Sequence, residues 1–101
     1  MKLEIRHLKL IAAVAEEGSV TRAGHRLRLT QSALSHQLRD VEEKLGAPLF
    51  LRLNKKMVLT QAGERLLSSA HAVLGELKRA EENIRQIALA KEGLPSLEDS
   101  R

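Results

Sequence analysis

The feature that most constrains the fold is an apolar seam in the second half of the chain. Its members are spaced alternately by four and three residues, which places them on one side of an α-helix. They are Leu66, Ala70, Val73, Leu77, Ala80, Ile84 and Ile87. A helix from Thr60 to about Ala90 would be roughly 45 Å long at ~1.5 Å per residue. A chain of 101 residues cannot bury so long a helix in one small core. We therefore expect the far part of the seam to pair with another helix, most simply that of a second copy.

A second amphipathic segment lies between Thr30 and Gly46. Thr30 can cap a helix with its hydroxyl, and Gly46 can adopt the left-handed conformation that ends one. The apolar stripe consists of Leu34, Leu38, Val41 and Leu45. The opposite face begins with hydrogen-bonding side chains, at Gln31, Ser32, Ser35, His36 and Arg39. Such a leading edge suits contact with a polyanion, and we interpret the segment as the recognition helix of a helix-turn-helix. The alternative is an amphipathic helix whose polar face has no special role.

Two shorter helices are expected before this segment. The first runs from about Glu4 to Glu17, and its apolar stripe is formed by Leu8, Ile11, Ala12 and Ala15, widened by Ile5 and Val14. Gly18 ends this helix, and Ser19 can cap the next one. Because glycine is a poor helix former, Gly24 in the second helix indicates close contact with another helix, although simple tolerance is the alternative. Residues 28–30 are then just long enough for the turn of a helix-turn-helix.

After Ala47-Pro48, the pattern changes from helical to strand-like. The runs 49–53 and 57–59 flank Asn54-Lys55-Lys56, which predicts a β-hairpin with two lysines at its tip. Beside a helix-turn-helix, such a hairpin would be a wing that presses cations onto phosphates or into a narrow minor groove. A solvated turn is the alternative.

The complete pattern predicts a mainly α fold. A winged helix-turn-helix, with three helices and a β-hairpin wing, would occupy residues 1–59. A dimerisation linker helix would occupy residues 60–91, and a flexible tail or the start of a further linker would occupy residues 92–101.

Positive charge is concentrated in two parts of the chain. The net charge is only +4, but residues 18–39 contain four arginines and no acidic residue. Residues 49–63 contain Arg52, Lys55 and Lys56, again without an acid. This distribution is typical of a nucleic-acid-binding surface. We expect Arg22, Thr30 and Arg39 to contact the DNA backbone beside the wing.

The residue types that are missing exclude several functions. Without cysteine there is no disulfide, thiolate nucleophile or Cys-based zinc site, and a cytoplasmic location is expected. His25 and His36 lack a third ligand, so we expect no metal, no cofactor and no enzymatic activity. Phe50 is the only aromatic residue, which disfavours single-stranded nucleic acid and RNA. The apolar run at residues 10–15 is too short for a signal peptide, and no segment has transmembrane length.

Five pieces of the chain, in this order and spacing, resemble the DNA-binding half of LysR-type transcriptional regulators. They are Leu8–Gly18, Leu29–Ser35, Glu42–Gly46, Pro48–Phe50 with Arg52, and Leu59–Gly63. The resemblance covers residues 1 to about 92 and implies a winged helix-turn-helix followed by a dimerising linker helix. It also implies that Gln31, Ser32, Ser35 and His36 approach base edges, whereas Arg52, Lys55 and Lys56 serve the wing. A homodimer would present two recognition helices to an interrupted palindrome in double-stranded DNA.

The sequence departs from the family pattern at two positions and in its length. Position 32 is often proline in the family and is Ser here, and position 36 is often arginine and is His here. A neutral His offers one donor where Arg offers a bidentate pair to guanine, so the base preference at that step stays open. The string Gln31–Gln37 is similar to the methionine-biosynthesis regulators of the family.

Family members continue into an effector-binding domain about twice the size of this chain. We therefore expect a truncated form rather than a short relative that binds DNA without sensing anything. A small-molecule effector would bind only to the absent domain, and a tetramer is conceivable for the full-length protein. The rival function is a coiled-coil adaptor that uses the Leu66–Ile87 seam and does not bind DNA.

Overall fold

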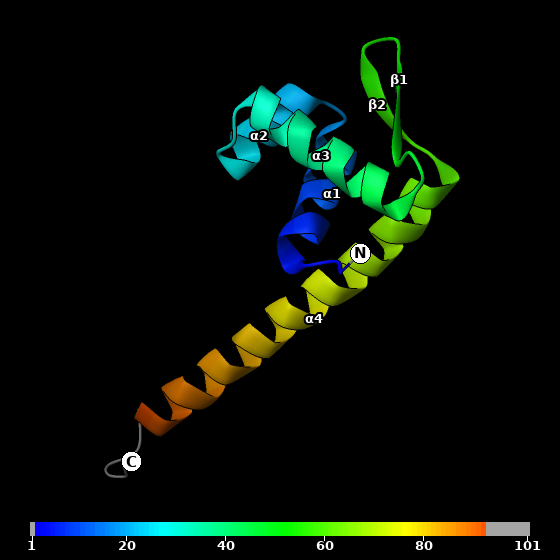
Figure 1. Ribbon diagram of the computed structural model, residues 1–101. Coiled ribbons are helices and arrows are strands. Elements are labelled where there is room, and N and C mark those ends of the chain that lie inside the picture. The colour runs from blue at the N-terminus through cyan, green and yellow to red at the C-terminus, as the bar shows by residue number, and fades with distance from the viewer. Residues whose placement is uncertain (1, 93–101) are drawn as a thin grey trace.

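The computed structural model describes residues 2–92 as three helices, a hairpin and one long helix (Figure 1). The elements are α1 (Ile5–Glu17), α2 (Val20–Leu27), α3 (Gln31–Leu45), β1 (Phe50–Leu53), β2 (Lys56–Leu59) and α4 (Gln61–Glu92). The first three helices and the hairpin gather at one end, and α4 extends away from them as a rod (Figure 1). The predicted fold class, a winged helix-turn-helix followed by a long helix, is confirmed. The predicted tail lies outside the described residues, apart from Glu92 at the end of α4.

The helix ends follow from local capping chemistry. The Ser19 hydroxyl oxygen accepts a hydrogen bond from the Arg22 N–H at 3.2 Å, and the Thr30 hydroxyl oxygen accepts one from the Ala33 N–H at 3.0 Å. These bonds satisfy backbone donors that have no partner inside a helix. Gly18 and Gly46 end α1 and α3 with φ of +68° and +78°, the left-handed region that glycine tolerates best.

The turn between α2 and α3 is tight. Arg28 adopts φ of +60° at the end of α2, and the Leu29 N–H donates to the Gly24 carbonyl at 2.8 Å. A Cβ atom at Gly24 would lie 2.8 Å from the Leu29 carbonyl oxygen. The predicted crowding at Gly24 is confirmed, but its partner is the backbone of this turn. The nearest atom belongs to the turn rather than to a helix, and the neighbouring helix follows at the Gln31 nitrogen, the start of α3, at 3.9 Å.

The core is built where α1 and α3 meet the segment after α3. Its largest fully buried side chains are Leu10, Ile11, Val14, Leu34, Val41 and Leu49. Two ends of the predicted apolar stripes remain exposed, Ile5 and Leu45, each with 39% of its surface accessible. Both lie at helix ends that extend past the core, so periodicity alone overestimates their burial.

The wing is a two-stranded antiparallel hairpin in which Phe50 pairs with Leu59 and Leu53 pairs with Lys56. Its turn has two residues, Asn54 and Lys55, with φ of +50° and +67°. The prediction of a three-residue tip was therefore wrong, and Lys56 is the first residue of β2. Two positive φ angles in a two-residue turn match the right-handed twist of the paired strands.

Two contacts fix the hairpin and α4 to the domain. The Met57 N–H donates to the Gly18 carbonyl at 3.1 Å, which ties β2 to the turn between α1 and α2. The Thr60 hydroxyl donates to the Pro48 carbonyl at 2.6 Å and accepts from the Gly63 N–H at 3.0 Å. Thr60 thus caps α4, as predicted, and also holds its start against the chain that follows α3.

The apolar seam of α4 divides into a buried part and an exposed part. Ala70 is fully buried within a single chain, and Leu66 packs against the core. Exposure then rises along the helix, from 42% at Leu77 to 64% at Ile84. Ala70 is covered inside its own domain and Leu66 is half-buried there, so the dimerisation expected of the seam, Leu66 and Ala70 included, stays a prediction. The part of the seam available to a partner is Val73, Leu77, Ala80, Ile84 and Ile87.

Candidate nucleic-acid interface

The leading edge of α3 presents the four residues expected to read bases. Gln31, Ser32 and His36 are exposed and Ser35 is half-buried. They occupy the first turns of α3, where the spacing 31, 32, 35 and 36 places them on one face of the helix beside its buried stripe. Thr30 lies directly before them, and its capping oxygen leaves the hydroxyl proton free to donate. The structure thus brings these side chains together on one open face.

Gln31 has a partner on the preceding helix that sequence reasoning missed. The Thr21 hydroxyl donates to Gln31 Oε1 at 3.2 Å. Thr21 lies in the first turn of α2, ten positions earlier in the chain. No periodicity or cap signal connects the two residues, because their proximity results from the crossing of α2 and α3.

The predicted cationic residues differ in their surroundings. Arg22, Arg28 and Arg39 are exposed. Arg26 instead forms ion pairs with Glu16 at 2.7 Å and Glu17 at 3.5 Å. Its hydrogen bond to Glu16 raises the pKa of Arg26 further above its ordinary value. Residues 18–39 contain no acid, but Glu16 and Glu17 of α1 neutralise one of their four arginines. That stretch therefore contributes fewer free cations to the surface than its sequence indicates.

Glu16 joins three helices. Its carboxylate accepts from Arg26 on α2 and lies 3.0 Å from Nε2 of His71 on α4. The hydrogen bond from Arg26, followed by that from His71, lowers the pKa of Glu16 below its ordinary value. His71 was not singled out from the sequence, because it is one of four histidines without a distinguishing motif.

The wing and α2 enclose a polar hollow of about 580 Å³. Arg22, Lys55 and Lys56 line it together with Glu16 and Glu17 at the end of α1 and the turn that follows. Arg52 is exposed on β1 and stands opposite Met57 in the hairpin. The structure therefore brings one cation of α2 beside the two wing lysines, a grouping that sequence order alone does not give.

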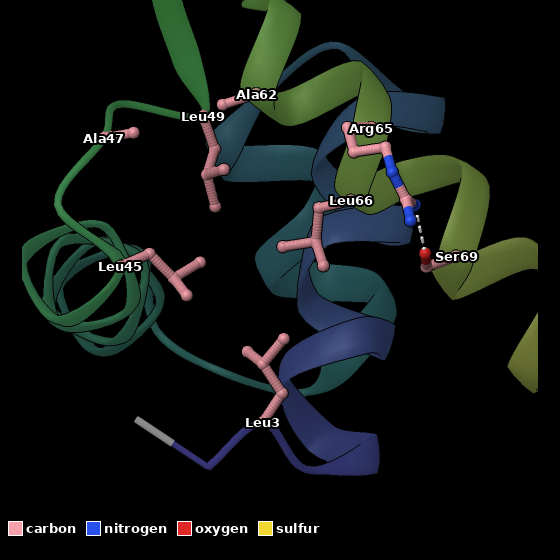
Figure 2. A pocket seen from close by; sticks show the side chains of 8 residues that line it. All are labelled: Leu3, Leu45, Ala47, Leu49, Ala62, Arg65, Leu66 and Ser69. Carbon is pink, nitrogen blue, oxygen red and sulfur yellow. Dashed lines mark hydrogen bonds between the residues drawn. The ribbon is translucent and has the colours of Figure 1, made fainter.

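A second hollow has a different character. Figure 2 shows an apolar groove of about 390 Å³ between the segment before α1, the end of α3 and the start of α4. Its polar side chains, Arg65 and Ser69, hydrogen-bond to each other at 2.6 Å at the rim. The lining consists otherwise of aliphatic side chains, including Leu3, Leu45 and Leu66. This groove lacks the converging polar groups that a catalytic site requires.

Within residues 2–92, no group of three or more His, Cys, Asp or Glu side chains is arranged to hold a metal ion. His25 and His36 are both exposed. In the same part of the chain, no helix is long and apolar enough to cross a bilayer.

A polar-faced helix after a tight turn, flanked by a cationic hairpin, defines the class of winged helix-turn-helix proteins. The chain belongs to one family within this class. The profile described as bacterial regulatory helix-turn-helix protein, lysR family, matches residues 5–64.

The relatives of this chain are transcriptional regulators. The HTH-type transcriptional regulator MetR of Haemophilus influenzae is 46% identical over 85 residues, which are 84% of this chain and 28% of that protein. A RuBisCO operon transcriptional regulator of Acidithiobacillus ferrooxidans is 46% identical over 81 residues, which are 75% of this chain and 26% of that protein. The chain thus spans less than a third of the length of these regulators, and the similarity extends across regulators of different operons.

A solved structure matches at the level of the domain. The crystal structure of the BenM DNA-binding domain in complex with catB site 1 DNA superimposes with a TM-score of 0.77. The two chains are 32% identical, and the match covers 85% of this chain and 97% of that one. Nearly the whole BenM domain is therefore matched by the winged helix-turn-helix and long helix of this chain.

Proposed function

We propose that this chain binds specific double-stranded DNA sequences as the DNA-binding part of a LysR-family transcriptional regulator. The observation that carries the proposal is the open polar edge of α3, and it is supported by the grouping of Arg22 with the wing lysines Lys55 and Lys56. The DNA complex of the BenM neighbour supports the same function. Because such a protein works on bacterial DNA, a cytoplasmic location is part of the proposal.

The proposed roles follow from where each side chain lies. Gln31, Ser32, Ser35 and His36 enter the major groove and read base edges. Arg22, Thr30 and Arg39 contact phosphates around the helix, and Arg52, Lys55 and Lys56 contact the backbone beside the wing. These roles require no metal or cofactor, and regulation by a small molecule would need a separate effector-binding domain.

The second part of the proposal is a homodimer formed through α4. Ile84 and Ile87 are 64% and 58% exposed, although they continue the same seam as the buried Ala70. Pairing with a second copy would remove ~1.5–3 kcal/mol of unfavourable exposure for each large side chain. Two-fold symmetry would then present two recognition helices to two half-sites.

One experiment separates this proposal from the coiled-coil adaptor. A random duplex pool is selected for binding, and the affinity of the best duplex is compared with that of an unselected duplex by fluorescence anisotropy. We expect the selected site to bind about a thousandfold tighter or more. A folded chain that binds neither duplex at low salt would contradict DNA binding. Competition with single-stranded RNA, which we expect to be ineffective, addresses the RNA alternative.

A further inference from the structure

The side-chain amide of Gln31 is held in one orientation before any ligand arrives. The Thr21 hydroxyl donates to Gln31 Oε1, and the two oxygen atoms are 3.2 Å apart. Both residues are exposed at the open face of the domain. The hydrogen bond therefore lies where a base edge would approach, and its geometry affects what Gln31 can offer.

The backbones that carry these two side chains are fixed independently. Ser19 caps the first turn of α2, and Thr30 caps the first turn of α3. Between them, the Leu29 N–H donates to the Gly24 carbonyl at 2.8 Å. Because both helix starts are held in this way, the side-chain hydrogen bond from Thr21 favours one rotation of the Gln31 amide.

The consequence is a difference between the two ends of this amide. Oε1 is directed back to α2 by the Thr21 hydroxyl, so the Nε2 group is left as the outward end with two N–H donors. Adenine is read by a glutamine that turns both its oxygen and its nitrogen to the base, accepting from N6 and donating to N7. Guanine presents two acceptors in the major groove, N7 and O6. One lone pair of Oε1 is already used by Thr21, so an amide that meets the base with its Nε2 donors matches guanine better than adenine.

We propose that Thr21 is a positioning residue that directs Gln31 Oε1 toward α2, so that Gln31 meets the base through its Nε2 donors and favours guanine over adenine at the base pair that it faces. This inference rests on the proposed function, because it assumes that α3 reads DNA. It adds a residue outside the recognition helix that determines specificity without contacting the base.

The test compares Thr21→Val, which keeps the shape and removes the donor, with Thr21→Ser, which keeps the donor. Gln31→Ala first identifies the base pair, as the position where base preference is lost. Anisotropy then gives the affinity of each protein for duplexes with guanine or adenine at that position. We expect the guanine-to-adenine ratio to fall by about two- to tenfold in Thr21→Val, the range for one net hydrogen bond. Thr21→Ser should keep the wild-type ratio, and affinity for unselected duplex should stay the same in all variants.

Each other result overturns a stated part of the proposal. An unchanged ratio in Thr21→Val, or no base preference that depends on Gln31, overturns the role of Thr21 alone if the wild type still binds its site. An equal loss on every duplex would show that Thr21 contacts phosphate instead. A wild-type chain that binds no duplex overturns the proposed function, and this inference with it. Circular dichroism melting of the variants excludes loss of folding as the cause.

Discussion

At the scale of single residues, Gly63 is a position where two stretches of backbone approach closely. It is buried near the start of α4, directly against the chain that leaves α3. A Cβ atom at this position would lie 2.0 Å from the Leu49 carbonyl oxygen, which is backbone and cannot rotate away. Glycine is therefore required here because the Leu49 backbone approaches too closely for a side chain. Backbone conformation is not the reason, since among the described residues the glycines with positive φ are Gly18 and Gly46.

Gly63→Ala should lower the free energy of unfolding by ~1–3 kcal/mol, because the start of α4 must move to admit the methyl group. Gly75→Ala is the matched control on the same helix. Its Cβ would meet only the end of the Arg79 side chain at 3.6 Å. That substitution should raise stability by ~1 kcal/mol through helix propensity. Urea denaturation of both variants measures the difference, and equal stabilities would refute the close approach.

At the scale of elements, the helices and the wing are linked by a few polar contacts. Glu16 connects α1 to α2 through Arg26 and to α4 through His71. The Met57–Gly18 hydrogen bond connects the wing to the turn between α1 and α2. These contacts set the positions of the wing and the long helix relative to α3, and each can be tested separately.

The Glu16 contacts should make stability depend on pH in the acid range. Because its pKa is lowered in the folded state, Glu16 adds stability that is complete above its ordinary pKa of 4.5 and is lost as the pH falls below that value. The carboxylate is 43% exposed, so solvent screening limits the effect to ~0.2–1 kcal/mol. Glu16→Gln should melt below wild type at pH 7, and the difference should shrink as the pH falls below 4.5.

Glu43→Gln is the control for this titration. Glu43 is exposed on α3 and takes part in none of the ion pairs of residues 2–92. The Glu43→Gln substitution should leave the melting temperature unchanged at both neutral and acidic pH. A Glu16→Gln variant that shows the same deficit at low and neutral pH would contradict a role for the ionised carboxylate.

The wing should contribute to DNA binding through charge. Replacing Lys55 and Lys56 with Ala should flatten the dependence of log K on log salt by about two units, at ~0.9 per phosphate contact. The pair Lys2→Ala and Lys44→Ala removes the same charge elsewhere, at the chain start and at the end of α3, where Lys44 pairs with Asp40. That control should change the slope less. Equal slopes in wild type and the wing variant would leave the hairpin tip as a solvated turn.

At the scale of the whole molecule, the elongated shape leaves part of α4 without a neighbour in its own chain. The chain measures 59 Å by 25 Å by 18 Å, and α4 accounts for its length. The end of α4 lies beyond the other elements (Figure 1). It carries Ile84 and Ile87 on the face that α1 covers nearer its start, so the same seam that completes the core also continues into solvent.

Leu77→Asp should convert the proposed dimer into monomers, because it places a charge in the middle of this seam. Ile84→Asp tests the same contact farther from the domain. Leu89→Asp is the control, since Leu89 is 55% exposed but lies outside the seam. Light scattering should give monomers for the first two variants and a dimer for the control and the wild type. A wild-type chain that is monomeric at tens of micromolar and keeps full affinity for a two-half-site duplex would refute dimerisation.

The helix ends and the long helix of this protein could be predicted from the sequence alone. Ser19, Thr30, Gly18 and Gly46 mark the helix ends correctly, because a cap depends on neighbours within three or four residues. The 4-3 spacing of apolar residues predicted the long helix for the same reason. The polar edge of α3 could also be read directly, since a helix places residues such as Gln31 and Ser35 on one face.

The contacts between distant parts of the chain were decided only by the tertiary structure. The length of the helix predicted that the far part of the seam lies outside the core, but the repeat could not tell where burial stops, because the buried Ala70 and the exposed Ile84 occupy equivalent positions in it. Nor could the sequence pair Arg26 with Glu16 or Thr21 with Gln31, which depend on how the helices cross. Gly63 gave no signal as a site of close approach, because Leu49 is its neighbour only after the chain has folded. Periodicity and caps are properties of a helix by itself, whereas burial and side-chain pairing are properties of the surfaces that helices present to one another.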